Sequence, residues 1–436
     1  MSYSNELPTA KAGPVSACER LVGLDTLRGV AVLGILVMNI YAFAMPLAAY
    51  NNPLIMGGTE ALNIGTWFAT HIFFDQKFMS IFSMLFGAGM ILMMNRAEAR
   101  GADFGPIYYR RTIWLLALGA LHGYLIWFGD ILFLYALIGM IVFLFRKAPP
   151  RTLIAIAIVI LPMALLINFA SSFYIEDLQR QVAEIQQIES TGEALDEAQQ
   201  KKLDEWSEMR PFFAPNDADI QEEVAAHKGG YVDVLVHRAP FVVFMQVNLT
   251  LVFGIWRVGG LMLIGMALMK LGVLSGERST PFYIRMAVWS YGLGLPLAIL
   301  SAAILNAHDF DPLFVARVGG IPNYVASILV AFGHIAAVIL IVRSGVFRGI
   351  VARFAAVGRM ALSNYLMHSV VMTTIFYGYG FSLYADVPRL WQQAFVLALV
   401  SLQLFISPWW LKHFNFGPVE WLWRSLTYGQ RQPMRR

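Results

Sequence analysis

The sequence predicts an all-α membrane protein, a polytopic bundle of about ten transmembrane helices with both termini in the cytoplasm. Hydrophobic residues make up 58% of the 436 residues and charged residues only 14%, whereas soluble domains carry about 25% charged residues. Apolar runs of about twenty residues, the length that crosses a bilayer, recur along the chain. Most of the 32 basic residues fall between alternate pairs of these runs, which is the positive-inside pattern of a multi-pass protein.

Composition also excludes several other classes of protein. The single cysteine, Cys18, excludes an internal disulfide framework and a cysteine-based metal site. The pI near 9.0 reflects basic residues spread over many loops, so we expect the lipid bilayer and not nucleic acid as a partner. Residues 1–19 are polar and lack the apolar core of a signal peptide. No closely spaced histidine or acidic pair indicates a metal site, so we expect none.

Ten segments are predicted to cross the membrane, at 27–48, 72–95, 112–129, 131–146, 152–172, 252–271, 284–306, 321–342, 358–379 and 392–411. The predicted parts are a cytoplasmic tail (1–22), spans 1–5 (23–172), an outer insert (173–232), an interfacial helix with spans 6–10 (233–411) and a cytoplasmic tail (412–436). Only Gly129 and Asp130 separate the third and fourth spans, which predicts a tight hairpin. A further crossing at 236–251 would put the basic loop 343–359 outside, so 233–251 is interpreted as interfacial or re-entrant.

Residues 173–232 form the one soluble insert. They hold 14 of the 28 acidic side chains and five basic ones, in stretches of helical composition. An acidic segment translocates readily, so we expect a small helical cap on the outer face. The two interpretations are a solvated helical hairpin without a ligand and a lid over the outer mouth.

The first span opens with an acid and a base. Asp25 and Arg28 lie three residues apart on one helical face and can pair. Asn39 follows on nearly the same face, roughly 16 Å further along the helix. Ionisable groups in a membrane helix are costly, so they indicate function or a fixed internal pair.

The run LDTLRGVAVLGILVMN resembles the opening helix of the transmembrane acyltransferases. In the acyltransferase-3 branch a histidine stands at the position of Asn39, whereas the branch with asparagine includes heparan-α-glucosaminide N-acetyltransferase and the YeiB-like bacterial membrane proteins. Because asparagine cannot act as a general base, a catalytic histidine must come from elsewhere. Three further runs resemble the YeiB-like family itself: KFMSIFSMLFGAG, GRMALSNYL and FGPVEWLWRSLTY.

His122 is the first candidate for that base. Counted from Arg111 at the inner surface, it lies roughly 16 Å into the membrane, between Gly119 and Gly123. The spacing from His122 to Asp130 also resembles a motif of the YeiB-like family. A neutral histidine at this depth can take a proton from an amine or hydroxyl. The alternative is a histidine that donates one hydrogen bond across a helix pair.

Asp130 lies at the outer turn, roughly 12 Å beyond His122 along the helix. The preferred interpretation is a cap of the fourth span, and the alternative is a carboxylate that orients His122 if the hairpin folds inward. Asp75 and Lys77 lie at the outer end of the second span. Lys77 either extends to the interface or is a cation that pairs with Asp75 or contacts an acceptor substrate. The isolated His71, like His308 and His334, is interpreted as structural or exposed.

Asn364 and His368 lie four residues apart on one face of the ninth span. His368 is roughly 13 Å beyond Arg359, a depth similar to those of Asn39 and His122. Polar residues at one level on three helices suggest a polar chamber. His368 is the weaker catalytic candidate, because the YeiB-like pattern more often has glutamine there.

Glu420 and Arg424 follow the last span at the inner surface and are spaced to pair. One interpretation is an amphipathic anchor. The other is that Arg424 and Arg359 hold the phosphates of coenzyme A.

The resemblance implies an acyltransferase of the bacterial inner membrane. Acetyl- or acyl-coenzyme A would bind from the cytoplasm, with Asp25 and Arg28 beside it. His122 would act as general base, and Asn39 and Asn364 would position the thioester carbonyl or the acceptor. The acceptor would be a hydroxyl or amine of a glycan, lipid or envelope precursor. Alternatives are a solute transporter or channel that uses the polar chamber, and a structural or sensory protein. A homo-oligomer is compatible with each of these functions.

Overall fold

The protein is described here by a computed structural model that covers residues 21–436. Residues 1–20, which include Cys18 and most of the predicted N-terminal tail, lie outside the described residues. Residues 21–436 are mostly helical and contain no β-strand beyond one isolated bridge. The all-α fold is therefore confirmed.

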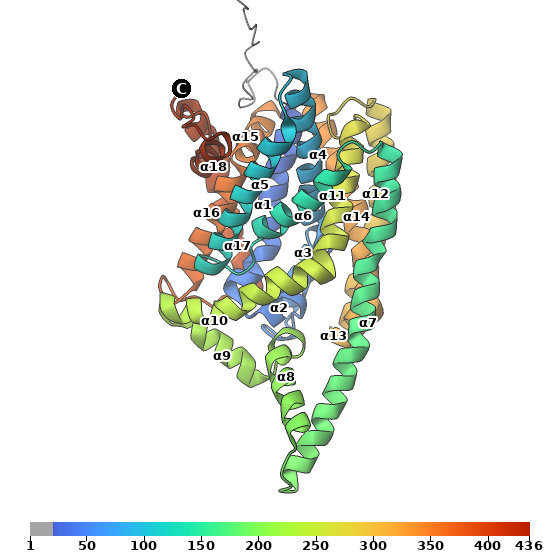
Figure 1. The fold of residues 1–436 in the computed structure, drawn as a ribbon, viewed down its shortest axis with the longest axis vertical. Coiled ribbons are helices and arrows are strands. Elements are labelled where there is room, and N and C mark those ends of the chain that lie inside the picture. The colour runs from blue at the N-terminus through green and yellow to red at the C-terminus, as the bar shows by residue number, and fades with distance from the viewer. Residues whose placement is uncertain (1–20) are drawn as a thin grey trace, which may run out of the picture.

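The bundle comprises α1 (Val22–Ala44), α3 (Ala61–Phe73), α4 (Lys77–Ala99), α5 (Phe104–Leu125), α6 (Leu132–Val142), α7 (Pro150–Ser190), α11 (Gly259–Lys270), α12 (Thr280–Ala307), α14 (Ile321–Ser344), α16 (Ala361–Phe376) and α17 (Arg389–His413). Outside it or at its ends lie α2 (Leu47–Asn51), α8 (Glu197–Phe213), α9 (Asp217–Lys228), α10 (Tyr231–Phe244), α13 (Pro312–Phe314), α15 (Arg348–Arg359) and α18 (Pro418–Tyr428). Figure 1 shows α8 and α9 at the end of the bundle opposite the C-terminus. We call these the insert end and the terminal end.

Within residues 21–436, seven helical stretches are long and apolar enough to cross a membrane, which supports the predicted membrane protein. Each of the ten predicted spans overlaps helices of the bundle, although the second is divided between α3 and α4. The number of crossings and their sidedness stay predictions.

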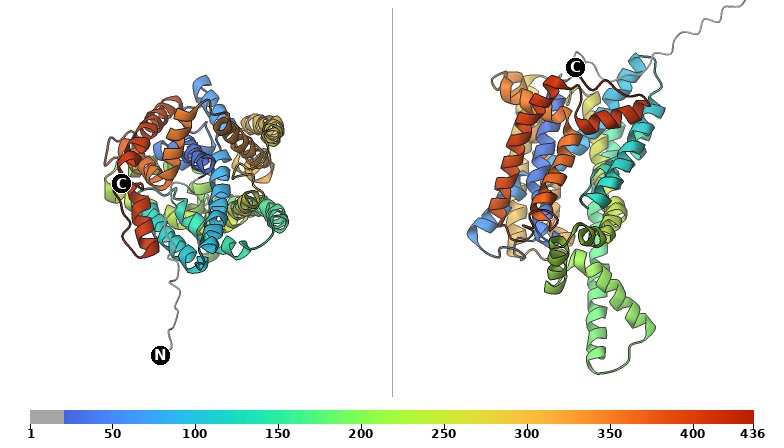
Figure 2. Two further views of the ribbon diagram at one scale, coloured as in Figure 1. Left: turned by 90° about the horizontal axis from the view of Figure 1, so that it is seen from above. Right: turned by 90° about the vertical axis from the view of Figure 1, so that its left-hand side faces the viewer.

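Helix α1 is the centre of the bundle. It packs against α4, α14, α15, α16 and α17, and Figure 2 shows it surrounded by other helices. A helix that is apolar on all sides is stable only when buried, and α1 is buried along most of its length. Gly29 lets α15 approach closely, because a Cβ there would lie 2.0 Å from the carbonyl oxygen of Phe354.

The second predicted span is interrupted. Instead of one helix over 72–95, α3 ends at Phe73 and α4 begins at Lys77. Between them Gln76 has a φ of 60°, and both Phe74 and Asp75 donate their N–H groups to the Thr70 carbonyl. Asp75 and Lys77 therefore mark a break within the apolar run and not the outer end of a single helix.

The hairpin between α5 and α6 is longer than predicted. Helix α5 ends at Leu125 and α6 begins at Leu132, so the loop includes residues assigned above to the third span. Trp127 holds this loop against α1 by stacking on Phe43 at a centroid distance of 3.9 Å. Trp127 thus packs against α1 the loop that begins where α5 ends.

Residues 231–270 form one continuous helical stretch, in which a π-helical segment, Met245–Val258, joins α10 to α11. In Figure 1, α10 crosses the insert end obliquely and α11 runs into the bundle. The chain does not turn back within 233–251, and the interfacial position of α10 stays a prediction.

The insert is helical, as predicted from its composition. Helix α7 continues from the bundle without a break into the insert, α8 returns from its tip toward the bundle, and α9 follows beside α10. An ion pair between Arg317 and Glu176 joins the base of the insert to the bundle.

Candidate functional site

His122 lies in the last turn of α5 and is 2% exposed. Its Nδ1 lies 2.7 Å from Oδ1 of Asp130, and its Nε2 lies 2.9 Å from Oγ of Ser369 on α16. Ser369 is fully buried. The structure thus places a carboxylate, an imidazole and a hydroxyl in one line of hydrogen bonds.

Asp130 lies much closer to His122 than the predicted separation. The estimate of roughly 12 Å assumed a helix that continues to Gly129, whereas the chain turns back after Leu125 and returns Asp130 to the histidine. The second carboxylate oxygen accepts a hydrogen bond of 2.7 Å from the N–H of Phe133, at the start of α6. Asp130 therefore both caps α6 and orients His122.

The hydrogen bonds assign the roles of the two imidazole nitrogens. An ionised carboxylate only accepts hydrogen bonds, so Nδ1 carries the proton and donates it to Asp130. Nε2 is then an acceptor facing the hydroxyl of Ser369. This is the order of groups that activates a serine in acyl-transfer enzymes, which is recognised by geometry and not by sequence position.

Sequence reasoning missed Ser369. It follows His368 directly and lies four residues after Tyr365 in the run NYLMHS. The available signal was a small hydroxyl on the same helical face as Tyr365, at the depth assigned to His368.

Asn364 and His368 face α17. The His368 Nε2 lies 2.8 Å from Oε1 of Gln403, and the Asn364 side chain donates a 3.1 Å hydrogen bond to Ser407. The side chains of consecutive helical residues point about 100° apart, so Ser369 faces His122 while His368 faces α17. The structure does not bring Asn364 and His368 to His122.

Asn39 also stays apart from this line of hydrogen bonds. Its side chain is half-buried, and among the described residues none forms a hydrogen bond with it. The predicted chamber of Asn39, His122 and His368 is therefore replaced by the Asp130–His122–Ser369 arrangement.

A cavity of about 270 Å³ opens at the terminal end of the bundle. Five arginines line it: Arg28, Arg96, Arg111, Arg359 and Arg424. The predicted Asp25–Arg28 pair is confirmed at 3.1 Å and lies in its wall. The inner lining is largely aromatic and aliphatic. A cationic mouth with an apolar interior suits a ligand that carries phosphates on an apolar arm.

Tyr365 lies between this cavity and His122. It lines the cavity, and its ring centroid is 5.3 Å from that of His122. Its hydroxyl donates to the Gly129 carbonyl and accepts from the N–H of Ile131. Tyr365 therefore holds the hairpin in place and closes the inner end of the cavity toward the histidine.

Glu420 holds the start of α16. Its carboxylate accepts hydrogen bonds from the N–H groups of Leu362 and Ser363 and from the Ser363 hydroxyl. Burial raises the pKa of this carboxyl, and the hydrogen bonds oppose that shift. A carboxylate on the first N–H groups of a helix is a stabilising cap, and this cap anchors the helix that carries Ser369.

Lys77 does not extend to the interface, which corrects that interpretation. Its side chain is fully buried, and Nζ donates hydrogen bonds of 2.6 Å to the His71 carbonyl and to Oδ1 of Asn323. Asn323 in turn donates to Asp75, whose carboxylate lies 3.2 Å from Nδ1 of His71. The expected isolation of His71 is wrong. The break between α3 and α4 turns these groups inward, away from the position expected for an acceptor site.

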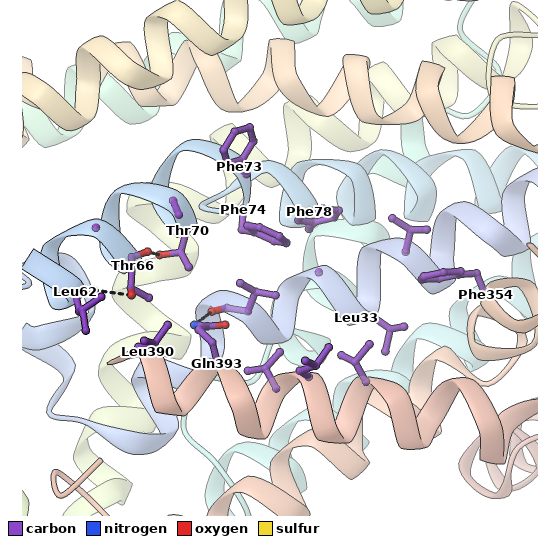
Figure 3. Close-up of a pocket in the computed structure, with 18 of the residues that line it drawn as sticks. Leu33, Leu62, Thr66, Thr70, Phe73, Phe74, Phe78, Phe354, Leu390 and Gln393 are labelled. Atoms are coloured by element: carbon purple, nitrogen blue, oxygen red, sulfur yellow. Dashed lines mark hydrogen bonds between the residues drawn. The ribbon is translucent and has the colours of Figure 1, made fainter. Parts of the chain in front are cut away.

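A second cavity, of about 690 Å³, is a groove on the side of the bundle between α1, α3 and α17. In Figure 3 its polar side chains, Thr66, Thr70 and Gln393, gather toward one end, and Phe354 lies at the other. None of Asp130, His122 and Ser369 lines this groove. Its apolar walls suit an acyl chain of the bilayer.

Comparison with known proteins places the chain in a family. It is 32% identical to "Uncharacterized protein YeiB" of Escherichia coli (strain K12) over 424 residues, which cover 94% of this chain and 96% of that protein. The chain belongs to the YeiB-like family. It is also 32% identical to "Uncharacterized protein YxaH" of Bacillus subtilis (strain 168) over 431 residues, 97% of each chain.

A more distant relative is the "Uncharacterized 39.9 kDa protein in amylase 3'region" of Bacillus acidopullulyticus, 25% identical over 421 residues and 97% of each chain. The family described as "Protein of unknown function (DUF418)" matches residues 268–430 of this YeiB-like protein. That region contains Ser369 and Arg424 but not the hairpin with His122 and Asp130. No solved structure matches the chain.

Proposed function

We propose that this YeiB-like protein is an acyltransferase of the bacterial inner membrane, which moves an acyl group from acyl-coenzyme A to a hydroxyl or amine of a glycan, lipid or envelope precursor. The observation that carries the proposal is the buried line of hydrogen bonds from Asp130 through His122 to Ser369. The resemblance of the first helix to transmembrane acyltransferases points to the same chemistry.

In the first half-reaction Ser369 Oγ attacks the thioester carbonyl while His122 Nε2 takes the hydroxyl proton. The carbon–sulfur bond then breaks, and coenzyme A leaves as a thiol with the proton returned by His122. Asp130 stays ionised and stabilises the imidazolium. In the second half-reaction the acceptor gives its proton to His122, attacks the acyl group and releases Ser369, which regains the proton.

The arginine-lined cavity supplies the donor in this mechanism. Its cationic mouth would hold the phosphates, and its apolar interior would hold the pantetheine arm and the acyl group. The positive-inside pattern predicts that this end lies in the cytoplasm, on the side from which acyl-coenzyme A would bind. Tyr365 would have to move, because it separates the cavity from His122.

The first test is covalent labelling. Purified protein incubated with radiolabelled acetyl-coenzyme A, without acceptor, is expected to retain one acetyl group per chain on Ser369, located by peptide mass spectrometry. Ser369→Ala and His122→Ala should abolish the label. Ser407→Ala is the matched control, because Ser407 is equally buried but faces Asn364. Label that persists in Ser369→Ala would rule out the acyl-serine.

The second test is donor binding, measured by calorimetry with acetyl-coenzyme A in detergent. Wild type and His122→Ala should bind saturably, and Arg424→Ala should bind at least about tenfold more weakly, because a charged hydrogen bond to phosphate is lost. Arg353→Ala is the control, since Arg353 packs on Phe405 at the same end, outside the cavity. No binding at millimolar donor would contradict the proposed donor site.

Solute transport is the second candidate function, favoured by the buried ionisable groups. Lys77, Asp75, His71 and Arg257 lie within the bundle, and such groups mark ion pathways in many membrane proteins. Proton-coupled solute uptake into proteoliposomes, abolished by Asp75→Asn and retained in Ser369→Ala, would favour transport over acyl transfer.

A further inference from the structure

The helix that crosses the insert end packs one face against the hairpin of His122. Arg238 and Val242 of α10 and Gln246 of the π-helical segment that continues it recur at four-residue intervals and therefore share that face. Arg238 Nη1 donates to the carbonyl of Ile126. A Cβ built on Gly123 would lie 3.4 Å from Val242 Cγ1 and 3.6 Å from Gln246 Nε2. This face thus lies within one helical turn of His122, on the side opposite the arginine-lined cavity.

Several N–H groups on this face have no acceptor. Arg238 is 1% exposed, yet its Nε and Nη2 have no hydrogen-bond partner, and the same is true of Nε2 of Gln246. Within residues 21–436 no carboxylate lies at ion-pair distance from Arg238. Buried arginine is ordinarily paired with an anion, because its planar fork matches carboxylate and phosphate. A buried guanidinium with two open N–H groups therefore lacks its counter-ion.

A third open group comes from α16, the helix of Ser369. Tyr377, at the end of that helix, is fully buried, and its hydroxyl has no partner. The Tyr377 ring packs on His227 at a centroid distance of 4.8 Å, and His227 packs at 5.5 Å on His237, the residue before Arg238. The donors therefore come from α10, from the π-helical segment that follows it and from the end of α16.

We infer that Arg238, Gln246 and Tyr377 form a binding site for the phosphate group of the acceptor, reached from the insert end. Arginine, amide and phenol donors together match the oxygens of a phosphate monoester or diester. A phosphate held here would place the rest of the acceptor beside Ser369 and His122, while the donor approaches from the terminal end. This inference rests on the proposed function, because only a transfer reaction has an acceptor. It identifies that acceptor as a phosphorylated compound.

Phosphate binding is tested on the full-length protein in a phosphate-free maltoside detergent. Calorimetry and thermal unfolding are measured with inorganic phosphate, with glycerol phosphate and with glycerol as the uncharged control. Wild type should bind both phosphates saturably, with a higher Tm, and should not respond to glycerol. Arg238→Met should weaken binding by at least about tenfold, the effect of losing one charged hydrogen bond.

Two tyrosines provide a matched pair of variants. Tyr377→Phe removes an unpartnered hydroxyl, so it should leave the unliganded Tm unchanged or raised and weaken phosphate binding several-fold. Tyr384→Phe removes a hydroxyl that donates a 2.9 Å hydrogen bond to Glu223, so it should lower Tm and leave phosphate binding unchanged. This pair keeps the inference testable even if Arg238→Met does not fold.

The outcomes separate this site from the donor cavity and from the proposed reaction. No saturable binding by wild type, or binding retained in Arg238→Met and lost in Arg424→Met, would overturn the inference. Acetyl labelling of Ser369 is an independent measurement, so acyl transfer can fail while phosphate binding at Arg238 holds, and the reverse. Dispersed phosphatidylglycerol that binds much more tightly than glycerol phosphate would identify a lipid acceptor, and equal affinities a soluble one.

Discussion

Gly119 on α5 faces the backbone of Phe133 on α6 so closely that a Cβ on the glycine would lie 2.3 Å from the Phe133 nitrogen and 2.7 Å from Oδ2 of Asp130. This approach brings the two arms of the hairpin together and holds the Asp130 carboxylate beside His122. The geometry of the candidate site therefore depends on a residue with no polar group.

Gly119→Ala is expected to destabilise the protein by roughly 1–3 kcal/mol, because the methyl group meets backbone atoms that cannot rotate away. It should also reduce acetyl labelling of Ser369, because Asp130 is displaced. Thermal unfolding and labelling measure the two effects. Gly292→Ala in α12 is the control, since nothing lies within 4 Å of its Cβ position. Equal Tm values for the two variants would contradict the close packing.

Asp130→Asn should slow acetyl labelling of Ser369 by roughly 10²–10⁴-fold, the range for loss of a working general base. The asparagine amide can donate as well as accept a hydrogen bond, so it does not fix the proton on Nδ1 of His122. Because it is uncharged, it also does not stabilise the imidazolium. Stability should change little, because asparagine caps a helix about as well as aspartate. Asp103→Asn, at the cap of α5, should label at the wild-type rate, and a similar rate for Asp130→Asn would show that the carboxylate is dispensable.

The pH dependence of stability should reveal two opposing groups in α9. Burial raises the pKa of Glu223 to about 7 and lowers the pKa of His227 to about 4. Folded Glu223 binds its proton more tightly than in the unfolded chain, so its contribution falls as pH rises from about 4.5 to 7. Folded His227 binds its proton less tightly, so its contribution rises with pH from about 4 to 6.5.

Wild type should therefore show a flatter Tm profile between these pH values than either variant. Glu223→Gln should gain stability as pH rises from about 4 to 6.5, and His227→Gln should lose stability as pH rises from about 4.5 to 7. The slopes are expected to have opposite signs, with a span of up to about 3 kcal/mol at 1.36 kcal/mol per pKa unit. Parallel profiles for the two variants would refute the assignment.

Lys77→Met should destabilise the bundle, because it leaves two buried acceptors, the His71 carbonyl and Asn323 Oδ1, without their donor. The expected cost is roughly 1–3 kcal/mol for each unsatisfied group. Lys412→Met, at an exposed position of α17, should change stability by less than about 0.5 kcal/mol. A Tm for Lys77→Met at the wild-type value would mean that the buried network is not structural.

Local features of the candidate site were predictable because they depend on residues close in sequence. Asp25 and Arg28 are three residues apart on a helix, and the helix alone makes their pairing possible. Arg359 and Arg424 were predicted to hold the phosphates of coenzyme A, and both do line the cationic cavity. Lys77 was misplaced because an apolar run does not show where a break such as the one at Gln76 turns it inward.

Composition and periodicity by themselves determined that this is an all-α membrane bundle with an acidic helical insert, because burial in lipid requires long apolar helices whose backbone groups pair internally. Only the tertiary structure decided which polar side chains meet. His122, Asp130 and Ser369 come from a helix end, a loop and a helix remote in sequence. Their contact depends on where α5 ends and on how α16 is rotated, and both are set by packing between helices.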